Sequence, residues 1–376
     1  MQKKCIFHYP APFEKKKRSG SELRPICMLE ALKSCGYEVE IISGYGKERK
    51  RKIKDIKRKI KCGEKYDFIY SESLTQPTLL SEENHIPKHP FMDFSFFGFC
   101  KKRGIIITLF YRDIYWKFDK YKELLSIWKR GILVPFFKYD LFQYKKYLDI
   151  LYCPNINFAK LGLDDFFIKE LPPGCKINTD VTNYKKVKEK KDNYIKVFYV
   201  GGIAGFYDIS TFLLAMQSVK CVELTICTSE NHWLENKHLI EELINERVVV
   251  VHEDSDNLEQ YYREADMSLL CKKNDTYANI SSPIKAKETL GYGTPIIVSD
   301  NLAVAEDVKK GDYGWIVEPE PSAIKELLEY LSNHPEEINQ KTQNAIRAAK
   351  YNTWKARAEQ IIEDCKKIEA NKNPKL

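Results

Sequence analysis

Lys285 and Glu288 stand three residues apart in the stretch SPIKAKETLGYGTPIIVSD, and their types suit contacts with an anion and with hydroxyl groups. Ser282 is a favourable N-cap and Pro283 suits the first helical position, so a helix is predicted to begin here. The free N–H groups and partial positive charge of a helix N-terminus, with Lys285 added, favour a phosphate. Glu288 lies one turn further on, where its carboxylate can accept hydrogen bonds from both hydroxyl groups of a ribose.

The same two residues also fit a plain surface ion pair, which would contribute only about a few tenths of a kcal/mol. Spacing alone leaves both interpretations open. The helix is predicted over 283–292, and the apolar run after it predicts a strand over 295–298.

Short apolar runs alternate with helical patterns along the chain, which predicts parallel sheets with helices on both faces. The predicted strands of the first half are 4–8, 38–43, 67–71, 104–110 and 149–153. Those of the second half are 194–200, 221–227, 247–251, 266–271, 295–298 and 314–317. Further helices are predicted over 208–218, 234–245, 257–264, 302–309, 320–332, 335–349 and 353–368.

The chain of 376 residues is long enough for two domains with separate cores. The polar, Pro-containing and charged stretch around 168–192 indicates the boundary. We predict two doubly wound α/β domains, with the first over 1–168, a linker over 169–192 and the second over 193–350. Ligands of such sheets bind at the carboxyl ends of the strands, which predicts a site in the cleft between the domains.

The composition is that of a folded protein, with 43% hydrophobic and 30% charged residues. No apolar run reaches the roughly 18 residues that a membrane span needs, and the N-terminus is a poor signal peptide. The eleven cysteines form no C-x-x-C pair, which disfavours a disulfide framework or a zinc site. A reducing cytoplasm is therefore the expected compartment.

The net charge of +8 originates in residues 47–61, which hold ten Lys/Arg and two acidic residues. Ile53, Ile56 and Ile60 fall at helical spacing, so this run predicts a basic amphipathic helix. It is either a solvated helix face or a contact with an anionic membrane surface. Nucleic acid is a weaker alternative because no nucleic-acid motif accompanies it, and no nucleic-acid partner is expected. The helical, aromatic and basic stretch 119–147 fits packing within its domain or, less well, a lipid-facing patch.

The opening stretch resembles the S-P-x-K-x-x-E-x-x-x-x-G-x-P-V-I signature of GT-B-fold glycosyltransferases of the family-4-like group. The surrounding order is similar too: LPPGC at 171–175, VFYVGGIAGFYDISTFLLAM at 197–216, LEQYYREADMSLLCKK at 258–273 and YNTWKARAEQI at 351–361. The resemblance implies two Rossmann-like domains facing a cleft, with a C-terminal helix at 351–376 that returns to the first domain. It also implies transfer of a sugar from a nucleotide donor, usually with retention and without a bound metal or other cofactor.

The resemblance assigns donor contacts to residues after three predicted strands and to the start of the helix. Glu288 would hold the ribose, and Lys285 would lie near the diphosphate. The remaining positions are Gly201, Gly202 and Gly205 beside the phosphates, Thr228 and His252 to Asp254 around the base, and Ser282, Pro283 and Ile284 at the helix start. Lys272 is added to the donor-binding residues as a candidate cation.

Three positions depart from the family pattern. The Arg that commonly follows the first glycine is replaced by Gly202, and the Lys of the next helix by the sequence FYD. Lys272, Lys273 and Lys285 are candidates to supply the missing positive charge. A second acid found in many members is replaced by Ile280.

In the first half, the resemblance places Gly20 in a loop near donor phosphate and acceptor. The family's His-Asp pair after the fourth strand corresponds to Arg112 and Asp113, and Asp113 would orient the acceptor hydroxyl. Asp113 fits equally a helix N-cap at the end of a strand. His8, at the end of the first strand, either faces the cleft or packs inside the domain.

Other motifs carry less weight. The sequence VGGIAG lacks the first glycine and the acid of a dinucleotide fingerprint. Asp254-Ser255-Asp256 is a lone D-x-D, for which metal binding is a minor alternative. The expected function is sugar transfer from a UDP- or GDP-sugar to a glycan or lipid-linked acceptor in surface polysaccharide or glycoconjugate synthesis. A nucleotide-sugar epimerase and a non-catalytic glycosyltransferase-like subunit stay open as alternatives.

Overall fold

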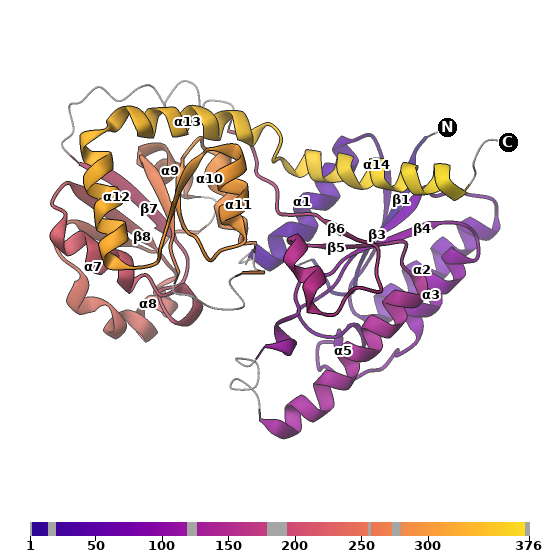
Figure 1. Ribbon diagram of the computed structural model, residues 1–376. Helices are drawn as coiled ribbons and strands as arrows, with labels where there is room; N and C mark the ends of the chain where they lie inside the picture. Colours follow the sequence, from indigo (N-terminus) through magenta and orange to yellow (C-terminus); the bar gives the residue numbers. More distant parts are fainter. Residues whose placement is uncertain are drawn as a thin grey trace. The chain divides into compact units, whose positions relative to one another are not determined.

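The computed structural model describes residues 2–13, 20–118, 126–178, 194–254, 257–272, 279–280 and 282–372. The chain forms two compact units (Figure 1). The first unit consists of Met1–Pro172 and Trp354–Leu376, and the second of Pro173–Thr353.

The first unit is built on a six-stranded parallel sheet with the strand order β2-β1-β3-β4-β5-β6. Its core strands are buried on both faces, as expected for a parallel sheet covered by helices. The strands are β1 (Lys4–Tyr9), β2 (Glu38–Ser43), β3 (Phe68–Glu72), β4 (Ile106–Phe110), β5 (Ile150–Cys153) and β6 (Ile168–Glu170).

The strand β6 was not predicted, and the linker predicted from residue 169 therefore begins too early. Its three residues IKE are only half-buried, so they lack the apolar signal of a strand. They pair in parallel with Leu151–Cys153 of β5 and extend the sheet by one strand at its edge.

Helices cover both faces of this sheet. They are α1 (Gly20–Ser34), α2 (Gly46–Lys61), α3 (Met92–Lys101), α5 (Ile127–Tyr147) and α14 (Trp354–Lys372), with short 3₁₀ helices η1 (Thr78–Leu80), η2 (Tyr115–Lys117) and η3 (Ile156–Leu161). Right-handed crossovers place α1 on one face and α2, α3 and α5 on the other. The helix α14, yellow in Figure 1, packs against α1. The predicted helix 119–147 corresponds to α5, and residues 119–125 lie outside the described residues.

The second unit has a six-stranded parallel sheet with the order β12-β11-β10-β7-β8-β9. The strands are β7 (Ile195–Val200), β8 (Val222–Cys227), β9 (Val248–Val251), β10 (Met267–Leu270), β11 (Ile296–Ser299) and β12 (Gly314–Val317). The chain winds outward from β7 to β9 and then returns to the other side of β7. The strand order reverses between β7 and β10, which is where a doubly wound sheet leaves a crevice for ligands.

The helices of this unit are α7 (Ser210–Ser218), α8 (Glu230–Asn236), α9 (Glu259–Glu264), α10 (Ile284–Gly291), α11 (Val304–Gly311), α12 (Pro321–Asn333) and α13 (Pro335–Ala349), with 3₁₀ helices η4 (Gly205–Tyr207), η5 (Lys237–Leu239) and η6 (Glu241–Leu243). The prediction of two doubly wound α/β units is confirmed. The prediction of a single helix over 234–245 is wrong. Ser229 caps α8 earlier by accepting a hydrogen bond from the His232 N–H, and two 3₁₀ turns replace its second half.

Close backbone contact positions α10. Its last residue, Gly291, lies so near the Lys176 carbonyl that a Cβ atom on it would be 2.0 Å from that oxygen. The Asn178 N–H donates a hydrogen bond of 2.9 Å to the Gly291 carbonyl. Ala286 and Leu290 are buried on the same side of the helix. The helix is therefore fixed at its C-terminal end by a contact that only glycine permits.

Arg49 fixes α2 from within the basic run. It is 2% exposed, and its guanidinium donates hydrogen bonds to Asp93 on α3, at 3.1 and 3.2 Å, and to Ser81 at 2.8 Å. Asp93 also lies 3.0 Å from His8 Nε2. Burial alone would raise the pKa of Asp93, but the His8 hydrogen bond and the Arg49 charge hold it at about 2. The basic helix is thus anchored by one of its own cations.

We predict that Gly291→Ala lowers the free energy of unfolding by about 1–3 kcal/mol, because the new methyl group displaces α10 or the 176–178 segment. Gly131→Ala is the matched control: Gly131 also lies in a helix, but a Cβ there meets no atom within 4 Å. This control should gain about 0.5–1 kcal/mol from helix propensity. Urea denaturation of both variants measures the two effects, and equal stability of the two would refute the packing argument.

We predict that Arg49→Met lowers the free energy of unfolding by about 3–5 kcal/mol at pH 7, because it leaves the buried Asp93 carboxylate without its cation. The low pKa of Asp93 means that its contribution is present above about pH 4 and is lost as the pH falls toward 2. The gap between Arg49→Met and wild type should therefore narrow at pH 3, where the unpaired carboxylate of the variant takes up a proton.

The control for this measurement is Lys50→Met, which removes an exposed charge from the next position. It should change stability by no more than about 0.5 kcal/mol. Guanidinium denaturation at both pH values distinguishes a specific buried pair from a general effect of positive charge on α2.

Candidate functional site

The carboxyl edge of the second sheet gathers most of the predicted donor contacts. Because all its strands are parallel, the segments that follow β7, β8, β9 and β10 emerge at one edge. The predicted residues on these segments are Gly201, Gly202, Gly205, Thr228, His252, Asp254 and Lys272. The helix α10 begins after the β10 segment and brings the remaining ones, Ser282, Pro283, Ile284, Lys285 and Glu288.

The start of α10 differs in detail from the prediction. The helix begins at Ile284 and its N-cap is Pro283, with no side-chain cap hydrogen bond, so Ser282 does not cap it. Proline holds φ at −63° with ψ at 133°, an extended conformation that ends the preceding loop one residue later than expected. Lys285 is therefore the second helical residue and still lies in the first turn, where free N–H groups attract an anion.

Lys285 and Glu288 form an ion pair of 2.8 Å with side chains 32% and 19% exposed. Both charges also affect the pKa values of neighbouring groups at the sheet edge. Burial raises the pKa of Tyr262, and the charge of Glu288 raises it further. Burial likewise raises the pKa of the Cys227 thiol at the end of β8, whereas the charge of Lys285 lowers it. The pair therefore lies against the strand ends and not on a remote surface.

The segment after β7 contains Gly201, Gly202 and Gly205 and is called the glycine segment below. Two side chains hold it in place. The Tyr199 hydroxyl donates a hydrogen bond of 2.5 Å to the Gly202 carbonyl. The Ile203 N–H donates one of 2.9 Å to His232 Nε2 on α8. A Cβ on Gly202 would lie 3.1 Å from His232 Nε2, so glycine lets the two segments approach. Gly205, with φ of 60°, turns the chain into η4.

His232 was not among the predicted site residues. It lies in a helical stretch with no motif, and only the fold shows that α8 reaches the glycine segment. Its Nε2 accepts the Ile203 N–H, so this ring nitrogen is unprotonated in the arrangement described.

Lys272 lies beside the glycine segment, across the point where the strand order reverses. Its ammonium nitrogen is 4.5 Å from the centroid of the Tyr207 ring, which is a cation–π distance. Its backbone N–H donates a hydrogen bond of 2.8 Å to Ser299 Oγ at the end of β11. The charge of Lys272 therefore lies next to the segment in which the family pattern places cations that this chain lacks. Lys273, the other candidate, lies outside the described residues.

The segments after β8 and β9 are joined by His252 and Thr228. His252 Nδ1 lies 2.9 Å from the Thr228 carbonyl, to which it donates. The Trp233 and His252 ring centroids are 6.4 Å apart. Asp254 follows on the same segment, whereas Ser255 and Asp256 of the D-x-D lie outside the described residues.

Lys287 supports the same helix from its buried face. It is 1% exposed, and its ammonium lies 2.8 Å from the Asp307 carboxylate and 3.3 Å from Asn352 Oδ1. No sequence signal distinguishes this lysine from Lys285. The structure assigns Lys285 to the sheet edge and Lys287 to a buried ion pair that holds α10 against α11.

In the first unit, Arg112 is engaged with a buried carboxylate. Its guanidinium donates to Glu72, fully buried at the end of β3, at 3.2 Å, and its backbone N–H donates to Ser73 Oγ at 3.0 Å. Asp113 Oδ1 accepts a hydrogen bond of 2.9 Å from the Tyr115 N–H at the start of η2. The N-cap of η2 is Ile114, with no side-chain cap hydrogen bond, so Asp113 is not the cap and binds the backbone two residues further on. A role of Asp113 toward the acceptor stays a prediction.

Two further predicted residues of the first unit do not form an open site. His8 is 2% exposed and lies between Ser71 Oγ, at 2.8 Å, and Asp93, so of the two alternatives it packs inside the unit. Gly20 was predicted to lie in a loop, but it is the first residue of the helix α1. Residues 14–19 lie outside the described residues.

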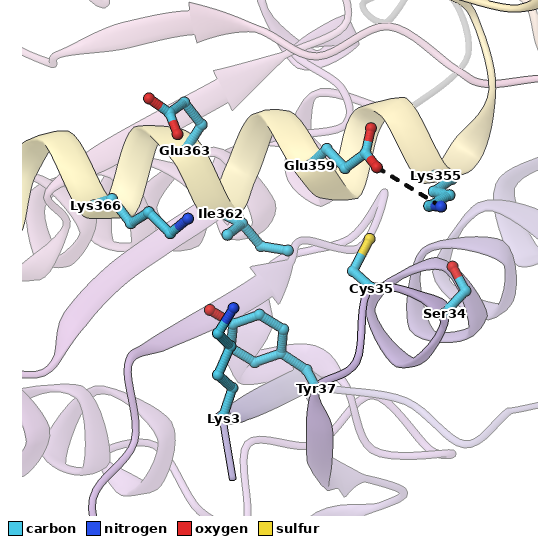
Figure 2. Close-up of a pocket in the computed structure, with 9 residues that line it drawn as sticks. All are labelled: Lys3, Ser34, Cys35, Tyr37, Lys355, Glu359, Ile362, Glu363 and Lys366. Atoms are coloured by element: carbon cyan, nitrogen blue, oxygen red, sulfur yellow. Dashed lines mark ion pairs between the residues drawn. The ribbon is translucent and has the colours of Figure 1, made fainter. Parts of the chain in front are cut away.

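A separate pocket of about 450 Å³ lies under α14 (Figure 2). Its lining combines Lys3 before β1, three residues between the end of α1 and β2, and five residues of α14: Lys3, Ser34, Cys35, Tyr37, Lys355, Glu359, Ile362, Glu363 and Lys366. Lys3 and Tyr37 directly precede β1 and β2, so this pocket is at the amino edge of the first sheet. Ligands of doubly wound sheets bind at the opposite edge, and the pocket is therefore not the candidate site.

The chain matches a known family over most of its second unit. Residues 180–351 match the family model for glycosyl transferases group 1. No curated protein matches the chain.

Solved structures are similar along almost the whole chain. A glycosyltransferase from Rickettsia africae is 15% identical, with a TM-score of 0.64 over 99% of this chain and 100% of that chain. Sucrose-phosphate synthase from Thermosynechococcus elongatus is 15% identical, with a TM-score of 0.62 over 98% of this chain and 100% of that one. HepE from Anabaena, solved in complex with UDP, is 12% identical, with a TM-score of 0.62 over 97% and 100%.

The structural similarities show that the chain has the GT-B fold. Residues 180–351 of its second unit are similar to the glycosyl transferases of group 1, as the sequence signature around Lys285 and Glu288 predicted.

Proposed function

We propose that this glycosyltransferase moves a sugar from UDP-sugar to a glycan or lipid-linked acceptor, with retention at the anomeric carbon and without a bound metal. The position of Glu288 carries the proposal: its carboxylate lies one turn inside α10, at the sheet edge where the glycine segment and Lys272 gather. HepE, solved with UDP and with UDP-glucose, supports a uridine nucleotide over GDP as donor. The work of this enzyme would be surface polysaccharide or glycoconjugate synthesis in the cytoplasm.

Glu288 would hold the donor ribose by accepting hydrogen bonds from its two hydroxyl groups. In the structure, this carboxylate is paired with Lys285 at 2.8 Å. Binding of a donor would let Lys285 turn toward the diphosphate while Glu288 takes the ribose, so both charges stay paired. Both side chains are partly exposed, which keeps the cost of this exchange low.

The diphosphate would meet three sources of positive potential. The first turn of α10 offers N–H groups, Lys285 adds a charge there, and Lys272 adds a second one beside the glycine segment. In the transfer step, the acceptor hydroxyl forms a bond with the anomeric carbon while the bond to the diphosphate oxygen breaks. The hydroxyl proton passes to the departing UDP on the same face. Stabilisation of the negative charge on UDP is the protein's main contribution.

The departures from the family pattern favour a second candidate function, which is that of a non-catalytic subunit that binds nucleotide. Lys272 counts against it, because it supplies a cation close to where Gly202 and the FYD sequence lack one. Release of UDP from UDP-glucose by the purified protein would exclude this alternative. Binding without release of UDP, in the presence of any tested acceptor, would establish it.

We further propose that the basic helix α2 contacts an anionic membrane surface, which would bring the enzyme to the inner face of a membrane. Its exposed residues include six cations, Lys47, Lys50, Arg51, Lys54, Arg58 and Lys61, and only two acids, Glu48 and Asp55. Arg49 belongs to the core, and Lys59 pairs with Glu40, so only part of the basic run is available for this contact. No helix among the described residues is long and apolar enough to cross a membrane.

We expect Glu288→Ala to weaken UDP binding by about 1.5–3 kcal/mol, because hydrogen bonds to a charged group are lost. Glu306→Ala is the matched control, since Glu306 forms a 3.0 Å ion pair with Lys310 on the exposed side of α11. It should leave UDP affinity unchanged. Titration calorimetry of UDP, GDP, ADP and CMP against the three proteins measures the effect and the base preference. Equal UDP affinity of Glu288→Ala and wild type would leave the Lys285–Glu288 contact as a plain ion pair.

We expect Lys272→Met to weaken UDP binding about tenfold and to leave uridine binding unchanged, because the lost charge acts on the diphosphate only. Lys309→Met removes an exposed lysine from α11 and should affect neither ligand. Competition binding with UDP and uridine distinguishes the two outcomes. A parallel loss of uridine affinity would show that Lys272 shapes the site and does not contact the phosphates.

A further inference from the structure

The first two turns of α5 expose large apolar side chains that the fold does not use. Ile127, Trp128 and Ile132 are 75%, 86% and 64% exposed. Trp128 and Ile132 are four residues apart and therefore lie on one side of the helix. Figure 1 shows that this end of α5 extends beyond the sheet of its unit. Isolated exposed apolar residues are ordinary, but three of them within six residues at a protruding helix end form a patch.

The rest of α5 is firmly held, so the exposed end is carried by a fixed helix. Phe137 stacks on Trp116 with ring centroids 5.3 Å apart and planes inclined by 7°. Asp140 accepts a hydrogen bond of 2.7 Å from the Thr78 N–H, and the Tyr144 hydroxyl lies 2.9 Å from Thr78 Oγ1. The buried residues of the helix begin at Phe137, and none lies in its first ten positions.

The charges on α5 indicate what kind of surface this end meets. Its only acidic residue is Asp140, which is buried, whereas Lys129, Lys138, Lys145 and Lys146 are exposed. Lys145 is paired with Asp165, and the other three give the outer surface of the helix a positive charge. The exposed cations of α2 lie on the same face of the sheet, because α2, α3 and α5 follow crossovers of the same direction. A partner must therefore be anionic and must accept tryptophan and isoleucine.

We propose that the first two turns of α5 insert into the headgroup region of an anionic lipid bilayer. Tryptophan favours the boundary between headgroups and acyl chains, isoleucine favours the apolar side, and lysines remain at the phosphates. Stable attachment of a protein to a membrane surface needs two signals, and α5 adds an apolar one to the charges of α2.

Insertion at this point has a consequence for the acceptor. The helix α5 runs antiparallel to the strands, so its first turns lie at the carboxyl edge of the first sheet. Arg112 and Asp113 follow β4 at the same edge. A bilayer contacting Trp128 would present lipid-linked hydroxyl groups on the side of the unit that bears these two residues. The membrane contact itself needs no donor and is independent of the proposed sugar transfer.

The test is binding of the full chain to vesicles of phosphatidylcholine with and without phosphatidylglycerol, at 0.1 and 0.5 M salt. We expect wild type to sediment with the anionic vesicles and to keep a measurable fraction bound at high salt, where charge alone is screened. Trp128→Ser/Ile132→Ser should reduce binding about tenfold at both salt concentrations. Trp128→Phe should retain binding but lose the fluorescence quenching that brominated acyl chains cause in wild type.

Tyr351→Ser/Leu239→Ser is the matched control, since it removes two comparably exposed apolar residues, 78% and 52%, from the second unit. It should bind vesicles as wild type does. The proposal is overturned if wild type does not bind anionic vesicles, or if the two double variants bind equally well. It is also overturned if wild type is a dimer that Trp128→Ser/Ile132→Ser makes monomeric, because a second copy of the chain would then cover the patch.

Discussion

The donor site depends on one constraint of the second sheet: β7 pairs with β8 on one side and with β10 on the other. A single central strand is flanked by connections that leave in opposite directions, so no crossover helix covers its carboxyl end. The glycine segment, Lys272 and the first turn of α10 all owe their position to this reversal. Glycine is needed there because His232 approaches from α8, and a side chain on Gly202 would occupy that space.

Buried charges link several elements of the first unit. Arg24 contacts the residues at which the chain leaves this unit and returns to it. Its guanidinium lies 3.4 Å from the Phe110 ring centroid, 3.4 Å from the buried Glu72 carboxylate and 5.7 Å from the Trp354 ring centroid, and it donates a hydrogen bond of 3.1 Å to the Leu171 carbonyl. Leu171 is where the chain leaves this unit, and Trp354 is where it returns. One buried cation therefore fixes both ends of the excursion to the second unit.

Much of this arrangement was predictable from the sequence where local signals are strong. Buried parallel strands are short apolar runs, and the strands over 38–43 and 314–317 match the predictions residue for residue. The predictions were weakest where contacts with residues distant in the sequence determine the secondary structure. The strand β6 exists because β5 offers it an edge, and α3 was missed because its apolar residues, led by Phe94 and Phe97, show little helical periodicity.

The site shows the same division. The signature residues Lys285 and Glu288 lie where the family pattern indicates, because one helix turn fixes their relation. The contacts that hold the segments together join positions that no short motif links. They are those of His232 with Ile203, Lys272 with Tyr207 and Lys287 with Asp307. A sequence pattern cannot separate Lys285 from Lys287, although one is partly exposed and the other buried, since the difference is made by Asp307 twenty positions further on.

The missing cation pair of the family pattern illustrates how charge is positioned in such sites. A diphosphate requires positive electrostatic potential at one point in space. The sheet determines which side chains reach that point, and their positions in the sequence do not. His232 and Tyr207 occupy the space beside Gly202 in the segment after β7. Lys272 comes from the segment after β10, on the other side of the reversal, and its ammonium lies 4.5 Å from the Tyr207 ring centroid. The ring attracts the cation through its negative face and, unlike a carboxylate, carries no net charge of its own. The departure from the pattern is thus compatible with a working phosphate site, built from a neighbouring strand.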